Sequence, residues 1–111
     1  MEFAEERAGN VVIVRLAGRL DSAAAPAAEA SFARLIGDGA PRLAVDLSAL
    51  QYVSSAGLRV LLVVAKKVQQ AEGKIVLFAL PRNVREVFAI TGFDRIFTIA
   101  ADAAGAVAAA G

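Results

Sequence analysis

The sequence contains no histidine and no cysteine. The lack of cysteine excludes disulfide bonds and iron–sulfur clusters, and the lack of both residues removes the usual ligands of zinc, copper and haem. It also removes the common general base and the thiol nucleophile, so a reactive serine would have no usual activating partner. We therefore expect neither a cofactor nor enzymatic activity. A carboxylate-only site for magnesium or calcium is the one metal site that stays open.

The sequence also lacks a large excess of either charge sign and lacks long hydrophobic runs. Lysine and arginine number 12 against 11 acidic residues, a net charge of +1, so we expect no nucleic-acid partner. The apolar stretch 60–65 lies between Arg59 and Lys66 and is far shorter than the roughly 20 residues of a membrane-spanning helix. Residues 1–7 lack the apolar core of a secretory signal. We expect no membrane insertion and a cytoplasmic location.

The apolar residues that are present suffice for one hydrophobic core. The chain has 111 residues, 58% of them hydrophobic, which fits a single domain spanning 1–111 without disulfide support. Many of these residues are alanine, and charged residues are interleaved with them. This composition excludes a disordered chain.

Short β-branched runs alternate with longer runs of helical periodicity. Turn-forming Gly9 and Asn10 separate the first two strand-like runs, which suits a hairpin whose first strand lies at an edge. The stretch from Ser55 repeats apolar residues at three- and four-residue spacing and is the clearest helix. We predict strands at 2–7, 10–18, 43–47, 74–80 and 95–99, and helices at 24–36, 55–72, 81–91 and 102–110.

This alternation favours an α/β fold in which helical crossovers link parallel strands. We expect one compact domain with a mixed sheet of about four to five strands flanked by about four helices. Segment 48–53 is predicted to be a connection from the central strand 43–47 to the serines. Functional groups gather at the carboxyl ends of strands in such folds, and Ser54 and Ser55 fall at that edge.

The two serines stand where the long helix begins. A helix start leaves N–H groups without intrahelical partners and carries the positive end of the helix dipole, which suits an anion such as phosphate. A serine there is most often only an N-cap, but one cap needs one hydroxyl, and Ala56 and Gly57 leave the start uncrowded. Arg59, one turn beyond Ser55, is either a partner for a phosphate on that serine or a solvated charge.

Asp21 is a second candidate, as the cap of the first helix or as a functional carboxylate. Other familiar motifs are absent from the sequence. The serines lack the glycine two positions upstream that a nucleophile elbow uses. No glycine-rich run precedes Lys-Ser or Lys-Thr, and residues 37–39 fit a helix stop better than a phosphate-cradling loop.

Four short motifs follow one another along nearly the whole chain. They are Leu-Ala-Gly-Arg-Leu-Asp at 16–21, Val-Asp-Leu-Ser at 45–48, Val-Ser-Ser-Ala-Gly-Leu-Arg at 53–59 and Phe-Ala-Ile-Thr-Gly-Phe at 88–93. In this order and spacing they resemble the STAS domain of bacterial anti-sigma factor antagonists. The family fold, a sheet flanked by helices, agrees with the elements predicted from the residues.

The resemblance implies a phosphorylation switch. In that family the antagonist binds an anti-sigma factor that is also a serine kinase, and phosphorylation of the serine two residues before the glycine of Asp-Ser-Ser/Thr-Gly-Leu breaks the interaction. By position that serine is Ser55, with Ser54 as second choice. Ser54 stands where the family has aspartate, and Ala56 where it has serine or threonine. Asp21 matches an aspartate that the family uses in kinase recognition or phosphorylation.

The function implied is that of an anti-sigma factor antagonist in a partner-switching pathway. The implied partners are an anti-sigma factor with serine kinase activity and, for resetting, a PP2C-type phosphatase. We expect the phosphate to act locally, by charge and steric mismatch at the partner, without refolding. The implied partner-binding residues are Asp21, Ser54, Ser55, Ala56, Gly57, Leu58 and Arg59.

Two alternatives stay open. The first is a scaffold or regulatory subunit, for example of a lipid-transport complex, that docks through the apolar face near Leu58 and Val63. The second is a nucleotide- or anion-binding module that uses the same helix start without phosphorylation.

Overall fold

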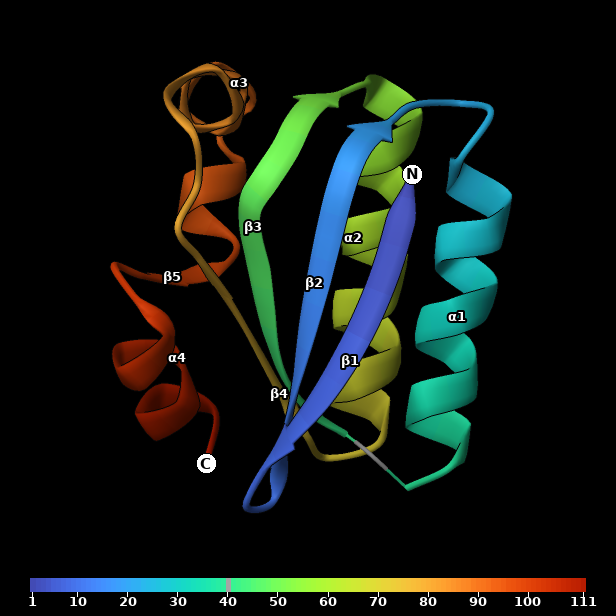
Figure 1. Ribbon diagram of the computed structural model, residues 1–111, viewed down its shortest axis with the longest axis vertical. Coiled ribbons are helices and arrows are strands. Elements are labelled where there is room, and N and C mark those ends of the chain that lie inside the picture. The colour runs from blue at the N-terminus through green and yellow to red at the C-terminus, as the bar shows by residue number, and fades with distance from the viewer. Residues whose placement is uncertain (40) are drawn as a thin grey trace.

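A five-stranded mixed sheet forms the centre of the protein in a computed structural model that describes residues 1–39 and 41–111 (Figure 1). The strands follow chain order across the sheet, with β1 antiparallel to β2 and all other neighbours parallel. The predicted hairpin and mixed sheet are therefore confirmed. The strands are β1 (Glu2–Ala8), β2 (Val11–Leu20), β3 (Arg42–Val53), β4 (Lys74–Phe78) and β5 (Thr98–Ala100).

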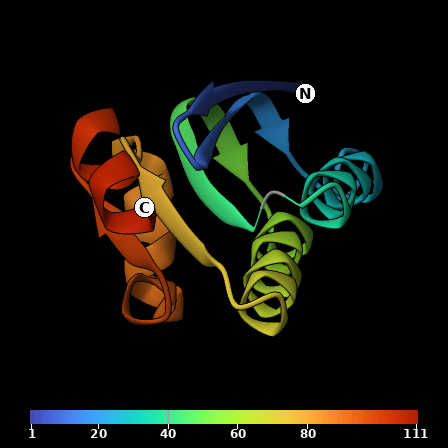
Figure 2. The same ribbon diagram turned by 90° about the horizontal axis from the view of Figure 1, so that it is seen from below.

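Four α-helices cover the two faces of the sheet unequally. Helices α1, α2 and α3 lie on one face and α4 on the other (Figure 2). Each crossover between parallel strands runs through one of the first three helices, because parallel neighbours need a long connection that returns to the same end of the sheet. The helices are α1 (Ala25–Gly37), α2 (Ser55–Gln70), α3 (Arg82–Thr91) and α4 (Ala103–Ala110), with a short 3₁₀ helix η1 (Phe93–Arg95) after α3.

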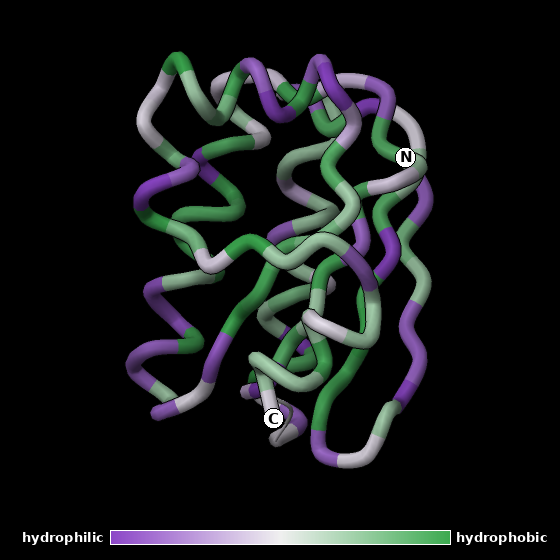
Figure 3. The backbone as a smooth tube through the Cα atoms, turned by 90° about the vertical axis from the view of Figure 1, so that its left-hand side faces the viewer, coloured by the Kyte–Doolittle hydropathy of each residue, from purple (hydrophilic) through white to green (hydrophobic). Residues whose placement is uncertain are grey.

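Apolar side chains form a large and a small core on the two faces. Phe32, Leu61 and Phe88 pack on the α1–α3 face together with one set of strand residues. Ala106 and Ala110 of α4 pack against the alternate set on the other face. Figure 3 shows several polar residues along β1 beside a mostly apolar β2, as expected for an exposed edge strand next to a buried one.

The central strand is longer than the sequence predicts. Segment 48–53 is not a separate connection, because β3 continues to Val53. Its pairing with β2 shifts register twice, so β3 carries extra residues opposite β2, which break the alternation of buried and exposed positions. Asp46 supports the first shift, because its Oδ1 accepts a hydrogen bond from the Ser48 N–H at 2.9 Å.

Several other element ends differ from the predictions. The last strand begins at Thr98, because 93–95 form η1 and the apolar Ile96 and Phe97 follow outside the strand. Strand β4 ends at Phe78, where Ala79 takes a positive φ of 57°. Helix α2 ends at Gln70, two residues before the predicted end. Ala24, not Asp21, is the N-cap residue of α1.

Candidate functional site

The carboxyl ends of β2 and β3 bring the candidate residues to one edge of the sheet. Leu20 pairs with Val53 in the parallel ladder, so Asp21 and Ser54 each follow a member of the same pair. The Ser54 N–H donates to the Leu20 carbonyl at 3.0 Å, which ties the start of α2 to the end of β2. The predicted position at the carboxyl edge is confirmed.

The Ser54 hydroxyl forms hydrogen bonds with the backbone of neighbouring elements. Its Oγ accepts a hydrogen bond from the Gly57 N–H at 3.2 Å and donates to the Leu20 carbonyl at 3.4 Å. Ser54 is thus the N-cap of α2, with the extended backbone typical of that position. Both functions of the hydroxyl are occupied, which leaves it little freedom to react.

Ser55 is the first residue of α2 and is exposed to solvent. Among the hydrogen bonds of residues 1–39 and 41–111, none involves its hydroxyl. Because Ser54 caps only Gly57, the N–H groups of Ser55 and Ala56 point out of the first turn without an intrahelical acceptor. The two serines, adjacent in sequence, therefore differ in structure: one is a cap and the other is free.

Ser55 lines a groove between the starts of α1 and α2, with a volume of about 490 Å³. Its walls carry one charge of each sign, Glu29 on α1 and Arg59 on α2, and these two side chains form no ion pair with each other. We call this hollow the Ser55 groove. Its lining residues are Ala25, Pro26, Glu29, Ser55, Ala56, Arg59 and Val60.

Asp21 lies at the same edge of the sheet but lines a different hollow. Its Oδ1 accepts a hydrogen bond from the Ala24 N–H at 3.1 Å, and its Oδ2 lies 3.8 Å from Arg19 Nε. The Arg19 guanidinium in turn stacks 4.3 Å from the centre of the half-exposed Tyr52 ring. Asp21 therefore shapes the turn into α1, next to the Ser55 groove and outside its walls.

Comparison with known proteins identifies the fold built around this edge. The STAS domain family profile matches residues 3–106. The chain belongs to the STAS domain family. This STAS domain is 42% identical over 109 residues to BtrV of Bordetella bronchiseptica, which is named as an anti-sigma factor antagonist. The match covers 98% of this chain and 94% of BtrV.

Solved structures agree with that assignment. An anti-sigma factor antagonist from Mycobacterium paratuberculosis is 28% identical, with a TM-score of 0.88 over 98% of this chain and 92% of that one. A Thermotoga maritima structure, named for the same class, has a TM-score of 0.91 at 22% identity, over 97% of this chain and 93% of that one. The second likeness concerns the fold alone.

Two residues of the STAS signature are buried in this structure. Leu58 is only 5% exposed and belongs to the large core. The Leu58 side chain therefore contributes to the core and not to an exposed docking face near Leu58 and Val63, whereas Val63 is half-buried. Gly57 is also buried, and a Cβ there would meet the Leu20 carbonyl oxygen. Both residues seat α2 on the sheet.

The sequence does not indicate that three residues of α1 line the Ser55 groove, namely Ala25, Pro26 and Glu29. The spacing of Ala25 and Glu29 places them one turn apart on a helix. Nothing in the sequence indicates that this helix lies beside α2, because that neighbourhood results from the order of strands in the sheet.

Arg15 of β2 and Asp46 of β3 form a charged pair across the two strands. Arg15 Nε lies 3.2 Å from Asp46 Oδ2, and Asp46 is 7% exposed. Burial alone would raise the pKa of the Asp46 carboxyl, but hydrogen bonds from Ser48 and Arg15 and the charge of Arg15 outweigh it and lower the pKa below its ordinary value. Asp46 thus stabilises the β3 bulge as a carboxylate.

Residues 1–39 and 41–111 contain no cluster of three or more acidic side chains that could hold a metal ion. Within the same ranges, no helix has the length and apolar character needed to cross a membrane.

Proposed function

We propose that this STAS domain is an anti-sigma factor antagonist, which binds an anti-sigma factor with serine kinase activity and is released when Ser55 is phosphorylated. The observation that supports the proposal is the difference between the two serines in hydrogen bonding and exposure. Ser54 is occupied as a cap, whereas Ser55 is exposed at the N-terminus of α2 in a groove with Arg59. The class name of BtrV, at 42% identity, supports the same function.

The chemistry of the groove explains how one phosphate would act. The kinase transfers the γ-phosphoryl group of ATP to Ser55 Oγ, which loses its proton, and ADP leaves. The product carries about −1.5 to −2 charges at neutral pH. The free N–H groups of the first turn and Arg59, one turn along, can neutralise that charge within the domain. Arg59 is then drawn toward Ser55 and is no longer available to a partner.

Partner binding is proposed for the exposed and half-exposed residues of this edge, namely Asp21, Ser54, Ser55, Ala56 and Arg59. A partner seated in the Ser55 groove would meet Glu29 and a neutral serine, and phosphate would place a second negative charge beside Glu29. The protein is in this view a kinase substrate and not an enzyme. It acts in the cytoplasm as a single domain of residues 1–111, and a PP2C-type phosphatase restores it.

The test incubates the protein with ATP and with candidate serine kinases, chosen from any encoded near its gene, and then analyses by mass the peptide that contains both serines. We expect one phosphate on Ser55 in the wild-type protein and in Ser54→Ala, and none in Ser55→Ala. Ser22→Ala is the matched control, because Ser22 is an exposed serine at the same end of the sheet. Phosphate on Ser54, or on Ser55→Ala, would contradict the assignment.

A parallel measurement addresses the anion-binding alternative. Inorganic phosphate and ATP are added without kinase, and the melting temperature of the protein is recorded. The proposal predicts no saturable stabilisation, because the covalent phosphate, not a free anion, occupies the helix start. A saturable rise that Arg59→Ala abolishes would favour a module that binds anions without phosphorylation.

A further inference from the structure

We propose that the trough between the second half of α2 and residues 96–98 is a second docking surface, which takes an acidic amphipathic helix of a partner protein. This surface lies on the opposite side of α2 from the Ser55 groove. It does not depend on phosphorylation of Ser55, so the proposal stands apart from the function proposed above.

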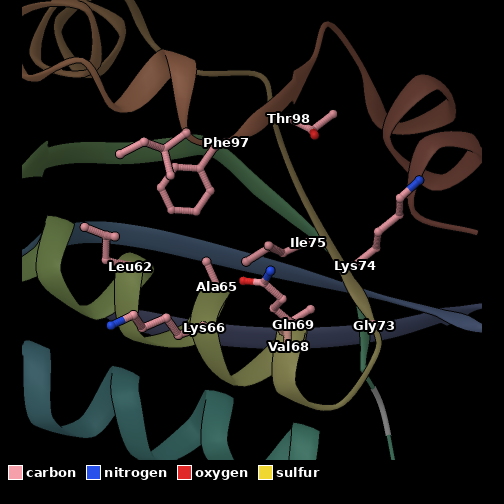
Figure 4. Close-up of a pocket in the computed structure, with 11 residues that line it drawn as sticks. Leu62, Ala65, Lys66, Val68, Gln69, Gly73, Lys74, Ile75, Phe97 and Thr98 are labelled. Carbon is pink, nitrogen blue, oxygen red and sulfur yellow. The ribbon is translucent and has the colours of Figure 1, made fainter.

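The trough has a volume of about 350 Å³ and is formed by α2 from Leu62 to Gln69, by residues 73–75 and by residues 96–98. Figure 4 shows Phe97 on one side, Leu62 and Ala65 on the α2 side, and Ile75 between them. Helix α2 packs chiefly against α1, β3 and β4. Its remaining side, toward β5, is left open at this trough.

Apolar side chains line most of the trough, and the polar side chains that line it are Lys66, Gln69, Lys74 and Thr98. Val68 and Phe97 belong to the large core and reach the trough wall, and Ile75 packs on the same core half-buried. Ile96 is 57% exposed at the rim. Together with the half-buried Leu62, Ala65 and Ile75, it gives the trough an apolar surface that side chains of a partner could cover.

The trough is elongated along the axis of α2. Leu62, Ala65, Lys66 and Gln69 have the spacing i, i+3, i+4 and i+7, so they form one stripe along two turns of the helix. At 1.5 Å per residue this stripe is about 10 Å long. An open, elongated trough beside a helix suits a second helix laid along it, with its own apolar stripe facing down.

The positive charges at the trough favour a partner with negatively charged side chains. Lys66 and Lys74 extend away at its two ends, and no acidic side chain of residues 1–39 and 41–111 lines it (Figure 4). Within 1–39 and 41–111, neither lysine takes part in an ion pair. The Ser55 groove, by contrast, carries both signs. An apolar floor between two unpaired lysines complements a helix whose apolar stripe is flanked by glutamate or aspartate.

The test uses synthetic helical peptides as probes with the full-length protein. One peptide has leucine on one face and glutamate on the other, and its twin has lysine in place of every glutamate. Binding is measured by fluorescence anisotropy and located by amide chemical-shift changes. We expect saturable binding of the acidic peptide, weakened by salt, with the shifts gathered at α2 beyond Leu62, at residues 73–75 and at residues 96–98.

Matched variants separate charge from fold. The double variant Lys66→Glu, Lys74→Glu should bind the acidic peptide at least about tenfold more weakly. Lys67→Glu, the same change one residue away and outside the trough, should bind it like the wild type. Ala65→Phe should fill the trough and weaken binding of the acidic peptide without a change of charge.

Four outcomes would overturn the proposal. They are equal binding of the basic peptide, equal loss in Lys67→Glu, shifts located elsewhere or absent, and self-association of the protein through the trough in sedimentation equilibrium. Sodium octanoate, added as a small acidic amphiphile, must not displace the acidic peptide at equal concentration. If it does, the trough binds a small molecule and the assignment of a helix is wrong. None of these results depends on the state of Ser55.

Discussion

At the scale of single residues, the neighbouring Ser54 and Ser55 have different structural roles. Ser54 holds the first turn of α2 through Gly57 and Leu20, and Ser55 contributes no hydrogen bond to the described part of the fold. The sequence predicts a cap and a spare hydroxyl at this junction. It does not show which serine is the cap, because serine is a favourable N-cap residue at either position.

Stability measurements should separate the two serines. Ser54→Ala removes the cap and is expected to lower the free energy of unfolding by about 1 kcal/mol. Ser55→Ala removes an exposed, unbonded hydroxyl, so the change should stay within about 0.5 kcal/mol. Urea unfolding followed by circular dichroism measures both. Equal losses in the two variants would show that Ser55 is not free.

Asp46 should make stability depend on pH in acid. Since its pKa lies below the ordinary value in the folded protein, its stabilising contribution is complete above the unfolded pKa of about 3.9. The contribution is lost as the pH falls through the lower, folded pKa. Asp46→Asn should therefore be less stable at neutral pH and should show a flatter decline of unfolding free energy below about pH 4.

Asp94→Asn is the control for that measurement, because Asp94 is exposed on η1 and forms no ion pair within 1–39 and 41–111. It should keep the wild-type pH profile. If Asp46→Asn kept it as well, the hydrogen bonds to Ser48 and Arg15 would not be stabilising the folded state.

At the scale of elements, the long periodic segments are predicted well and the irregular ones poorly. Helix α2 and strand β2 follow from unbroken patterns. The sequence predicts too short a β3, because two register shifts interrupt the alternation beyond Leu47. It predicts too early a start for the last strand, because Ile96 and Phe97 have the character of strand residues, whereas Ile96 lines the trough and Phe97 packs in the core. Tertiary context decides these places.

The contact between α2 and β2 depends on Gly57. A Cβ there would meet the Leu20 carbonyl oxygen, so α2 must move outward to accept any side chain. Gly57→Ala should lower the free energy of unfolding by about 1–3 kcal/mol, as overpacked core positions do. Gly37→Ala, in the last turn of α1, where a Cβ would meet no atom of the described residues within 4 Å, should instead raise it by up to about 1 kcal/mol, because alanine is the better helix former.

Differential scanning calorimetry would compare the two glycine variants. Helix propensity alone favours alanine at both positions, so an unchanged or increased stability of Gly57→Ala would contradict the close approach of α2 to β2. The same variants report on the site, because an outward shift of α2 would displace Ser55 and widen its groove.

At the scale of the whole molecule, we expect phosphorylation to change a surface and to leave the fold intact. Ser55 packs against nothing in the core, and a negative charge at the first turn of α2 is favourable to the helix dipole. Ser55→Asp should therefore raise the free energy of unfolding by about 0.3–1 kcal/mol, and uncharged Ser55→Asn should raise it less. Amide spectra should change only around the Ser55 groove.

The family and the overall architecture could be predicted from the sequence, because motif order and hydrophobic period survive in it. The groove itself could not, since three of its seven lining residues come from α1, which lies far away in the chain. Leu58, assigned to the binding surface from the motif, is a core residue. A motif identifies positions, whereas exposure depends on the packed structure.

The central claim is that charge at Ser55 controls association with the kinase anti-sigma factor. Isothermal titration calorimetry of that partner with Ser55→Ala, Ser55→Asn and Ser55→Asp tests it most directly, with Ser22→Asp as the control for added charge. We predict tight binding by the two neutral variants and the control, and a loss of at least about 2 kcal/mol, roughly thirtyfold, for Ser55→Asp. Equal affinities of all four variants would contradict the account.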